Sequence, residues 1–289
     1  MVFPILVFRD SQKVLDRLHG HRVVVRVDDP ENIVDAASRV QRTGNQLSCV
    51  ICDSVRPLSA ITPAESWAGI PVALFVPEVG RLRDLTATIH RTRDLDVHVY
   101  LPAARPENLV SLRILASLNV PSCATFGAEP PDWEALADLM TYALLGPIPH
   151  VPIDPFEYIA DHYAPDRWTQ WDAVTFSDPR RYLHLDAESR VALSHDDLLA
   201  GAFIADDLGA IDDIERHPAF VERAGRWRRF FAECTQCSCC PGWRVCQGMF
   251  VHTVERAPGC SAFFTELMDV VEQHNAKRRQ TRQPNRWRP

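Results

Sequence analysis

Several sequence patterns that commonly indicate a function are missing from this chain. No run of about 18 apolar residues occurs, so no membrane-spanning helix is predicted. There is no Gly-x-Gly-x-x-Gly, no Walker phosphate loop, no Gly-x-Ser-x-Gly and no His-Glu-x-x-His. The usual motifs for binding dinucleotides or nucleoside triphosphates, and for serine hydrolase or zinc protease chemistry, are therefore excluded.

Acidic residues outnumber basic ones in residues 1–274, whereas the C-terminal residues 275–289 are basic. The net charge is −7, and residues 275–289 hold six basic residues and no acidic one, which leaves −13 on the remainder. An acidic body argues against general nucleic-acid binding. We expect residues 275–289 to form a disordered basic tail. The acidic run Asp206–Glu215 lacks the pattern of a calcium loop and is expected to be a solvated face.

A secretion signal is also missing from the apolar start of the chain. Met1–Phe8 has no basic residue before its apolar stretch, and Arg9-Asp10 follows at once. We interpret this segment as a buried strand rather than a signal peptide. We therefore expect a cytoplasmic protein, whose thiols are kept reduced, and this favours metal binding over disulfide formation.

Six short segments rich in Val, Ile and Leu alternate with amphipathic stretches over residues 1–150. Such nearly continuous hydrophobicity is typical of parallel strands that are covered on both faces. Short connections and βα units of about 25 residues predict an α/β fold with a parallel sheet, either open or curved into a partial barrel. The predicted strands are Ile5–Phe8, Val23–Val27, Leu47–Cys52, Val72–Val76, Val97–Leu101 and Ser122–Phe126.

Helices are predicted between these strands and in the second half of the chain. For the first of them, Asp29 is a suitable N-cap, Pro30 suits the first turn and Gly44 suits the stop. A short strand at Ala173–Phe176 and a hairpin over Arg181–Ser194 are also predicted. The predicted helices are Pro30–Thr43, Leu82–Thr92, Glu107–Leu118, Asp132–Leu145, Pro155–Tyr163, Pro218–Ala232 and Ala262–Gln273.

Cysteine is concentrated near the carboxyl end of the chain. Six of the nine cysteines fall within the 27 residues from Cys234 to Cys260. Thiols crowded so closely bind a metal or a cluster, or they pair as disulfides. Cys237 and Cys240 are separated by two residues, which lets both sulfurs face one metal from a tight turn. Cys246 and Cys260 can then close the site from elsewhere in the loop.

The spacing leaves the identity of the metal and some of its ligands open. Sulfur-only ligation selects zinc or an iron–sulfur cluster, and the two are not separated by this pattern. Cys234 and Cys239 are alternate ligands, because Cys234-x2-Cys237 is also a valid pair. Free cysteine packs well as a small apolar residue, so the remaining cysteines are expected to be buried in strands: Cys49, Cys52 and Cys123.

The spacing Cys-x2-Cys-x5-Cys-x-Gly, followed by a later cysteine, resembles the SPASM domain of radical SAM peptide-modifying enzymes. In that family the domain follows a partial (β/α)6 barrel, begins with a β-hairpin and carries auxiliary [4Fe-4S] clusters. Tyr182–Ser194 resembles the opening hairpin, and Leu208–Phe220 resembles the segment before the cysteines. The match covers roughly residues 180–262, whereas residues 1–150 resemble the barrel only in their βα rhythm.

The chain departs from that family in its cluster ligands. Radical SAM enzymes need Cys-x3-Cys-x2-Cys after the first barrel strand, to hold the cluster that binds S-adenosylmethionine, and no such triplet occurs here. The first auxiliary cluster also lacks ligands, because Ser194 or His195 and Phe250 stand at its cysteine positions. The resemblance retains the ligand set of the second auxiliary cluster, which would be Cys237, Cys240, Cys246 and Cys260.

The resemblance implies a pseudo-radical-SAM protein with one [4Fe-4S] cluster and no bound S-adenosylmethionine. Such a protein would act beside a radical SAM or other modifying enzyme in the maturation of a ribosomal peptide. There it would bind the precursor peptide, dock on the enzyme or pass electrons. The implied parts are a partial barrel over residues 1–150, a SPASM-like domain over residues 151–274 and the basic tail over residues 275–289.

Two alternatives remain open from the sequence. The chain can be a metal-dependent peptide-modifying enzyme in its own right, using the C-terminal metal or an iron recruited at the barrel mouth. It can also be a binding module whose C-terminal region is folded by structural zinc. No catalytic residue can be assigned in either case.

Overall fold

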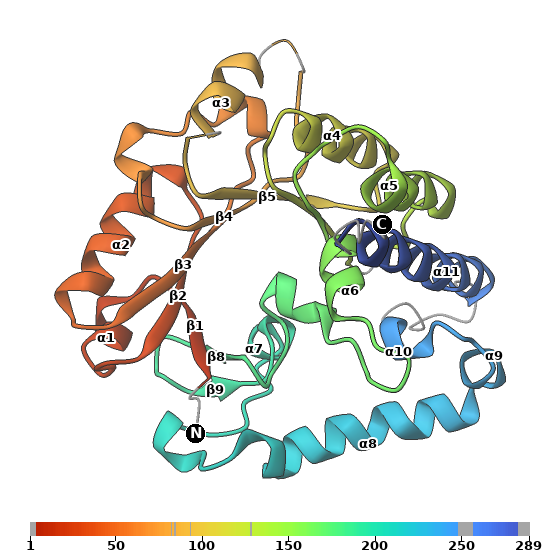
Figure 1. The fold of residues 1–289 in the computed structure, drawn as a ribbon. Helices are drawn as coiled ribbons and strands as arrows, with labels where there is room; N and C mark the ends of the chain where they lie inside the picture. The colour runs from red at the N-terminus through yellow and green to blue at the C-terminus, as the bar shows by residue number, and fades with distance from the viewer. Residues whose placement is uncertain are drawn as a thin grey trace, which may run out of the picture.

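The computed structural model contains one nine-stranded sheet with helices packed around it (Figure 1). It describes residues 4–81, 83, 85–92, 94–127, 129–247 and 257–282. The strand order is β7-β6-β5-β4-β3-β2-β1-β8-β9, and all neighbouring strands are parallel except β8 and β9. The predicted α/β class with a mainly parallel sheet is confirmed.

The first six strands follow one another across the sheet in chain order. Their side chains are mostly Val, Ile and Leu and are buried, as expected for parallel strands covered on both faces. Each of the six predicted strands is confirmed. They are β1 (Ile5–Arg9), β2 (Arg22–Val27), β3 (Gln46–Asp53), β4 (Val72–Phe75), β5 (Val97–Pro102) and β6 (Ser122–Thr125).

Five helices follow these strands and lie on the outer side of the curved sheet (Figure 1). The largest group of buried side chains fills the layer between these helices and the sheet. Burying that apolar layer is the main stabilising contribution to an α/β fold. The helices are α1 (Gln12–Leu15), α2 (Ile33–Arg42), α3 (Leu85–Thr92), α4 (Pro106–Ser117) and α5 (Trp133–Leu145).

The segment predicted as the first long helix begins with a 3-10 turn. The Asp29 carboxylate accepts a hydrogen bond from the Glu31 backbone N–H at 3.0 Å, so the predicted cap is present. The 3-10 turn η1 covers Pro30–Asn32, and α2 follows. Gly44 has φ 72°, a left-handed conformation that glycine adopts without steric cost, and the helix ends there.

The second half of the chain adds strands to both edges of the same sheet. Strand β7 (Ile153–Asp154) pairs with β6 and leads into helix α6 (Phe156–His162). The predicted hairpin forms β8 (Tyr182–Leu185) and β9 (Val191–Ala192), and β8 pairs in parallel with β1. Residues 153–192 are therefore continuous in hydrogen bonding with the strands of residues 1–150.

The strand predicted at Ala173–Phe176 is wrong. Trp171–Thr175 forms a 3-10 turn, η5, and Phe176 follows with φ 61°. Phe176 and Val174 pack against the inner face of the sheet, in a second group of buried side chains that includes Tyr100. A short apolar run predicts burial but does not by itself distinguish a strand from a turn that fills the concave side of a sheet.

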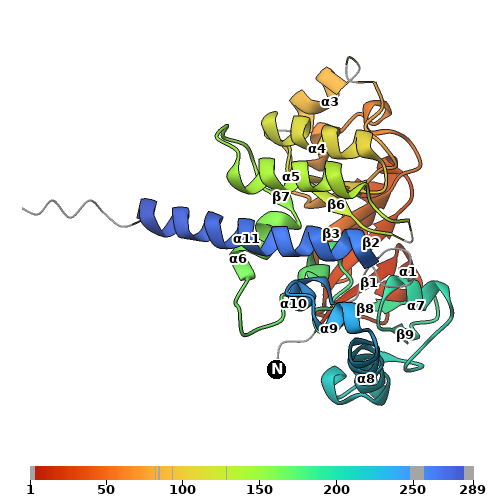
Figure 2. The same ribbon diagram turned by 90° about the vertical axis from the view of Figure 1, so that its right-hand side faces the viewer.

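The C-terminal third is mainly helical and lies along one side of the sheet (Figure 2). After helix α7 (His195–Leu199) come the 3-10 turns η6 (Leu208–Ala210) and η7 (Ile214–Arg216). The helix predicted at Pro218–Ala232 is present as α8 and ends one residue later. The remaining helices are α8 (Pro218–Glu233), α9 (Thr235–Ser238), α10 (Trp243–Cys246) and α11 (Ala257–Arg282).

The predicted disorder of the basic tail is wrong for residues 275–282, which continue α11. The Asn275 side-chain amide donates a hydrogen bond to the Ala160 carbonyl at 2.9 Å. Arg278 pairs with Asp161 and lies 3.9 Å from Glu157. These contacts tie part of the tail to α6, whereas residues 283–289 lie outside the described residues.

We predict that Tyr100→Phe lowers the free energy of unfolding by about 1 kcal/mol, because it removes a largely buried hydrogen bond. The Tyr100 hydroxyl donates to the Val174 carbonyl at 3.1 Å and so holds the η5 segment against the sheet. Urea denaturation measures the change. Tyr142→Phe is the matched control, since its hydroxyl contacts Ser117 Oγ at an exposed position where water can replace it. A loss no larger than in the control would contradict this account.

Candidate metal centre

The C-terminal cysteines lie on short helical segments that meet near the start of α11. Cys237 is in α9, Cys246 ends α10, and Cys260 is in the first turn of α11. Cys234 joins α8 to α9, and Cys240 lies between α9 and α10. Because α11 contacts both α9 and α10, segments that are separate in the sequence come together here (Figure 2).

The backbone between Cys234 and Cys246 folds as a series of tight turns. The Cys240 N–H donates to the Cys237 carbonyl at 3.2 Å, and the Trp243 N–H donates to the Cys240 carbonyl at 3.3 Å. The Cys246 N–H donates to the Gly242 carbonyl at 2.9 Å. These bonds are the close turns that the Cys-x2-Cys spacing predicted.

Several of the thiols that the sequence singled out lie close enough to influence one another. Cys237 is hydrogen-bonded to Cys234, and it lies within electrostatic range of Cys246 and Cys260. Cys260 interacts in the same way with Cys240 and Cys234. The Ser261 hydroxyl donates to Cys240 Sγ at 3.6 Å. Five thiols, the four predicted ligands and the alternate Cys234, therefore share one region.

The environment of these thiols disfavours an isolated negative charge. Loss of water contact, the hydrogen bond with Cys234 and the neighbouring thiols together raise the pKa of Cys237 to about 12. Burial is also the largest cause that raises the pKa of Cys260, followed by the charge of Cys240. Thiolates gathered in this way are stabilised when a cation lies among them.

Proximity here does not amount to a closed coordination shell. Among the described residues, no three Cys, His, Asp or Glu side chains converge closely enough to hold one metal ion. Cys239, the second alternate, is exposed. The donor chemistry fits a soft metal, because every donor in the region is sulfur.

The α10 side of this region is firmly attached to the body. The Trp171 indole N–H donates to the Val245 carbonyl at 2.7 Å, and Trp171 is only 3% exposed. The Gln247 side chain donates to the Thr169 carbonyl at 2.8 Å. These bonds link α10 to the connection between α6 and β8, so Cys246 is held relative to the sheet.

Two glycines allow the chain to pass close to α5 and α11. A Cβ at Gly242 would lie 2.4 Å from Phe264 Cβ, and one at Gly259 would lie 2.4 Å from Trp133 Cδ1. No real side chain tolerates such distances without movement of its neighbours. Gly242 precedes α10, and Gly259 precedes Cys260, so both close approaches position cysteine-bearing segments.

The three N-terminal cysteines are strand residues, as predicted. Cys52 and Cys123 are fully buried, whereas Cys49 is half-buried. Cys49 packs with the inner-face group and Cys52 with the outer core, so they lie on opposite faces of β3. Burial raises the pKa of both Cys49 and Cys52 to about 12, which suits packing rather than thiolate chemistry.

A histidine–carboxylate pair on the inner face was not predicted. His98 on β5 has Nε2 4.0 Å from Asp154 Oδ2 on β7, too far for a hydrogen bond. Burial lowers the pKa of His98 and raises that of Asp154, while the charge of each opposes the shift of the other. Only the order of the strands brings these two residues together, and no sequence spacing signals it.

A second unpredicted pair lies beside β8. The rings of His184 and His195 are 6.0 Å apart, and the half-buried His195 is the first residue of α7. Burial is the main cause that lowers the pKa of His184 to about 3, and the nearby Arg26 adds to it. His184 is therefore a neutral, structural histidine whose Nε2 lies 3.0 Å from the Phe176 carbonyl.

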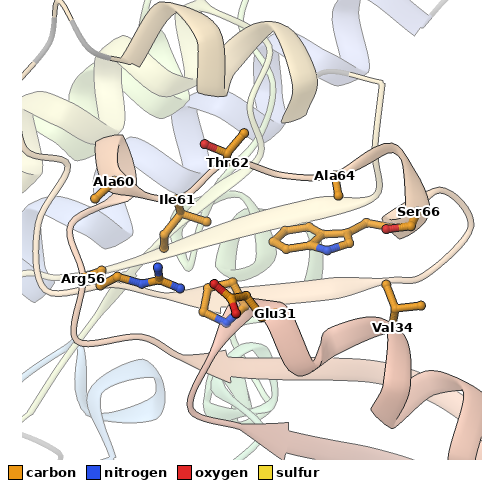
Figure 3. A pocket seen from close by; sticks show the side chains of 10 residues that line it. Glu31, Val34, Arg56, Ala60, Ile61, Thr62, Ala64 and Ser66 are labelled. Carbon is orange, nitrogen blue, oxygen red and sulfur yellow. The ribbon is translucent and has the colours of Figure 1, made fainter.

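One cavity of about 370 Å³ opens between η1, α2 and the connection from β3 to β4 (Figure 3). Arg56, Glu31 and Trp67 are among the residues that line it. The Arg56 guanidinium pairs with Asp29 at 2.9 Å. Figure 1 shows α2 on the side of the molecule opposite α9, so this cavity is remote from the cysteines.

No family model, curated protein or solved structure matches this chain. No described helix has both the length and the apolar character needed to cross a membrane. Evidence on function therefore comes from the fold and from the region that holds Cys234, Cys237, Cys240, Cys246 and Cys260, which we call the thiol region.

We predict that iodoacetamide modifies Cys239 before Cys246 and Cys260 in metal-free protein, because an exposed thiol is the most accessible to the reagent. Mass spectrometry of peptides after timed quenching measures the order. Equal rates after denaturation serve as the control. Faster modification of Cys246 or Cys260 in the folded chain would show that α10 and α11 do not cover them.

Proposed function

We propose that this chain is an iron–sulfur accessory protein of a ribosomal-peptide maturation system. It would bind one [4Fe-4S] cluster through Cys237, Cys240, Cys246 and Cys260. The observation that carries the proposal is the gathering of these thiols from α9, α10 and α11 into one region. The resemblance of residues 180–262 to a SPASM domain supplies the expected cluster type.

The local secondary structure supports a role for a metal in holding this region. Helices α9 and α10 have four residues each, and a single helical turn is unstable without further contacts. A metal centre bound by residues of both helices would supply such contacts, since metal binding is coupled to folding. Sulfur donors fit either an iron–sulfur cluster or zinc.

The arrangement of the strands supports the proposal that residues 1–150 form a partial barrel. Six parallel strands follow one another in chain order with their helices on the outer side, which is how an incomplete (β/α)6 barrel is arranged. In this proposal η5 fills part of the concave side. The absence of Cys-x3-Cys-x2-Cys from the sequence argues that no S-adenosylmethionine cluster is held there.

The proposed role needs no catalytic residue in this chain. A bound cluster can transfer electrons or act structurally, and its potential depends on burial and on hydrogen bonds to sulfur. The chain itself would hold the centre against α11 and shield Cys246 and Cys260 from water. The partners would be a precursor peptide, a maturation enzyme or both, in the cytoplasm.

Metal analysis of anaerobically purified protein tests this proposal. We expect brown protein with about four irons and four sulfides per chain. Cys240→Ser should remove most of the metal and destabilise the C-terminal third, because a ligand is lost. Cys239→Ser is the matched control, since its thiol is exposed, and it should retain the metal.

The other outcomes assign the chain to different functions. Colourless protein with one zinc per chain would replace the cluster by a structural metal and favour a zinc-stabilised binding module. Modification of a precursor peptide by the isolated chain would favour a metal-dependent enzyme. Protein that takes up neither iron nor zinc would overturn the proposal. Loss of metal from Cys239→Ser instead of Cys240→Ser would change the ligand set.

A further inference from the structure

Cys234 and Cys237 lie on one helical turn at the start of α9, with two residues between them. Cys234 directly precedes the helix, and its carbonyl accepts a hydrogen bond from the Ser238 N–H at 3.0 Å. Residues three positions apart on such a turn have Cβ atoms about 5–6 Å from each other on the same side. The two sulfurs are therefore neighbours, and Cys237 is hydrogen-bonded to Cys234.

The backbone at this turn allows the two sulfurs to approach further. A disulfide needs Cβ atoms about 3.5–4.5 Å apart, so the turn must tighten by roughly 1–2 Å. Cys234 has φ −93° and ψ 97°, which is extended rather than helical backbone, so its rotation does not unwind α9. No side chain of α9 whose exposure the structure describes is buried, so core packing does not oppose the movement. Both thiols are only half-buried, and a small reagent in solution can reach them.

Cys240 is the competing partner for Cys237, because it also lies three positions away along the chain. Its sulfur accepts a hydrogen bond from the Ser261 hydroxyl at 3.6 Å, and it interacts with Cys260 more strongly than Cys234 does. Ser261 and Cys260 both belong to the start of α11, so the Cys240 thiol is engaged by α11. The arrangement therefore favours the pair Cys234 and Cys237 over the pair Cys237 and Cys240.

We propose that Cys234 and Cys237 form a redox-active dithiol, which a low-molecular-weight disulfide such as oxidised glutathione converts to a disulfide when no metal is bound. One thiolate attacks a sulfur of oxidised glutathione, which forms a mixed disulfide and releases one glutathione thiolate. The second thiolate attacks the protein sulfur of that bond and releases the other glutathione. Two protein thiols are oxidised, one glutathione disulfide is reduced, and the two protons pass to the released glutathione thiolates.

This disulfide would control the loading of the proposed metal centre, a consequence that rests on the proposed function. Cys237 is one of the four proposed ligands, and only a thiolate serves as a metal ligand. The oxidised chain therefore lacks a ligand, and reduction of the disulfide restores it. An exposed or strained disulfide is the kind that is readily reduced, so the change is reversible. A metal bound first would in turn protect Cys237 from oxidation.

Equilibration of the full chain, freed of metal, with glutathione tests the dithiol without reference to the centre. The protein is incubated in buffers that contain graded ratios of reduced to oxidised glutathione, and the remaining thiols are quenched with iodoacetamide. Trypsin releases Phe230–Arg244 as one peptide, in which tandem mass spectrometry locates the linked cysteines. We expect an internal link between Cys234 and Cys237, and none that includes Cys239 or Cys240.

Two serine variants separate this pair from the other thiols. Cys234→Ser should lose the internal link, whereas Cys239→Ser, the matched control at an exposed position, should retain it. Circular dichroism establishes that both variants are folded. Glutathione adducts without an internal link in the wild-type chain would overturn the proposal. A link between Cys237 and Cys240, or an internal link that persists in Cys234→Ser, would overturn it as well.

Zinc binding tests the consequence for the metal centre. Reduced and oxidised wild-type chains are incubated with zinc ions, and the bound metal is measured after gel filtration. The oxidised chain should lose most of the zinc that the reduced chain binds, and dithiothreitol should restore it. Cys234→Ser should bind zinc equally after both treatments, because it cannot form the link. Equal binding by the two wild-type forms would contradict control of the centre. A disulfide in a chain that binds metal in neither state would contradict the proposed function and leave the dithiol in place.

Discussion

The packing of α11 against α5 and α6 determines where the C-terminal cysteines lie. The rings of Phe263 and Trp133 are 5.6 Å apart, and the rings of Phe263 and Phe156 are 6.5 Å apart. Further along the helix, His274 Nδ1 lies 2.6 Å from the Leu144 carbonyl. A helix held at several points along its length fixes its first turn as well. Cys260 is therefore placed relative to the sheet, and α9 and α10 meet it there.

The thiol region thus has a rigid side and a weakly held side. Trp171 and Gln247 hold α10, while α11 holds Cys260. Cys237 and Cys240 lie on a single helical turn and the loop after it, which have little buried surface of their own. A metal that joined both sides would add the cross-link that the segment lacks. The same weakly held side leads back into α8, which ends one residue before α9 begins, with Cys234 between them.

The sequence predicted β1 to β6 and the hairpin of β8 and β9, because Val-rich and Ile-rich segments at regular intervals are typical of strands that are covered on both faces. It did not predict β7 or the parallel pairing of β8 with β1. It failed at Ala173–Phe176, where apolar residues fill the concave face instead of joining the sheet. It also failed at residues 275–282, whose order comes from contacts with α6 that local composition does not reveal. Cysteine spacing drew attention to thiols that influence one another in the structure, but the ligand set itself stays a prediction. The pair His98 and Asp154 was unpredictable, because strand order alone joins them.

The central claim is that sulfur atoms near the carboxyl end hold one inorganic centre. X-ray absorption at the iron edge of anaerobically purified protein tests it most directly, because the method reports the atoms around the metal. The account predicts a first shell of sulfur only, with a second shell of iron that identifies a cluster. A first shell of nitrogen or oxygen, or protein that contains no iron, would contradict it.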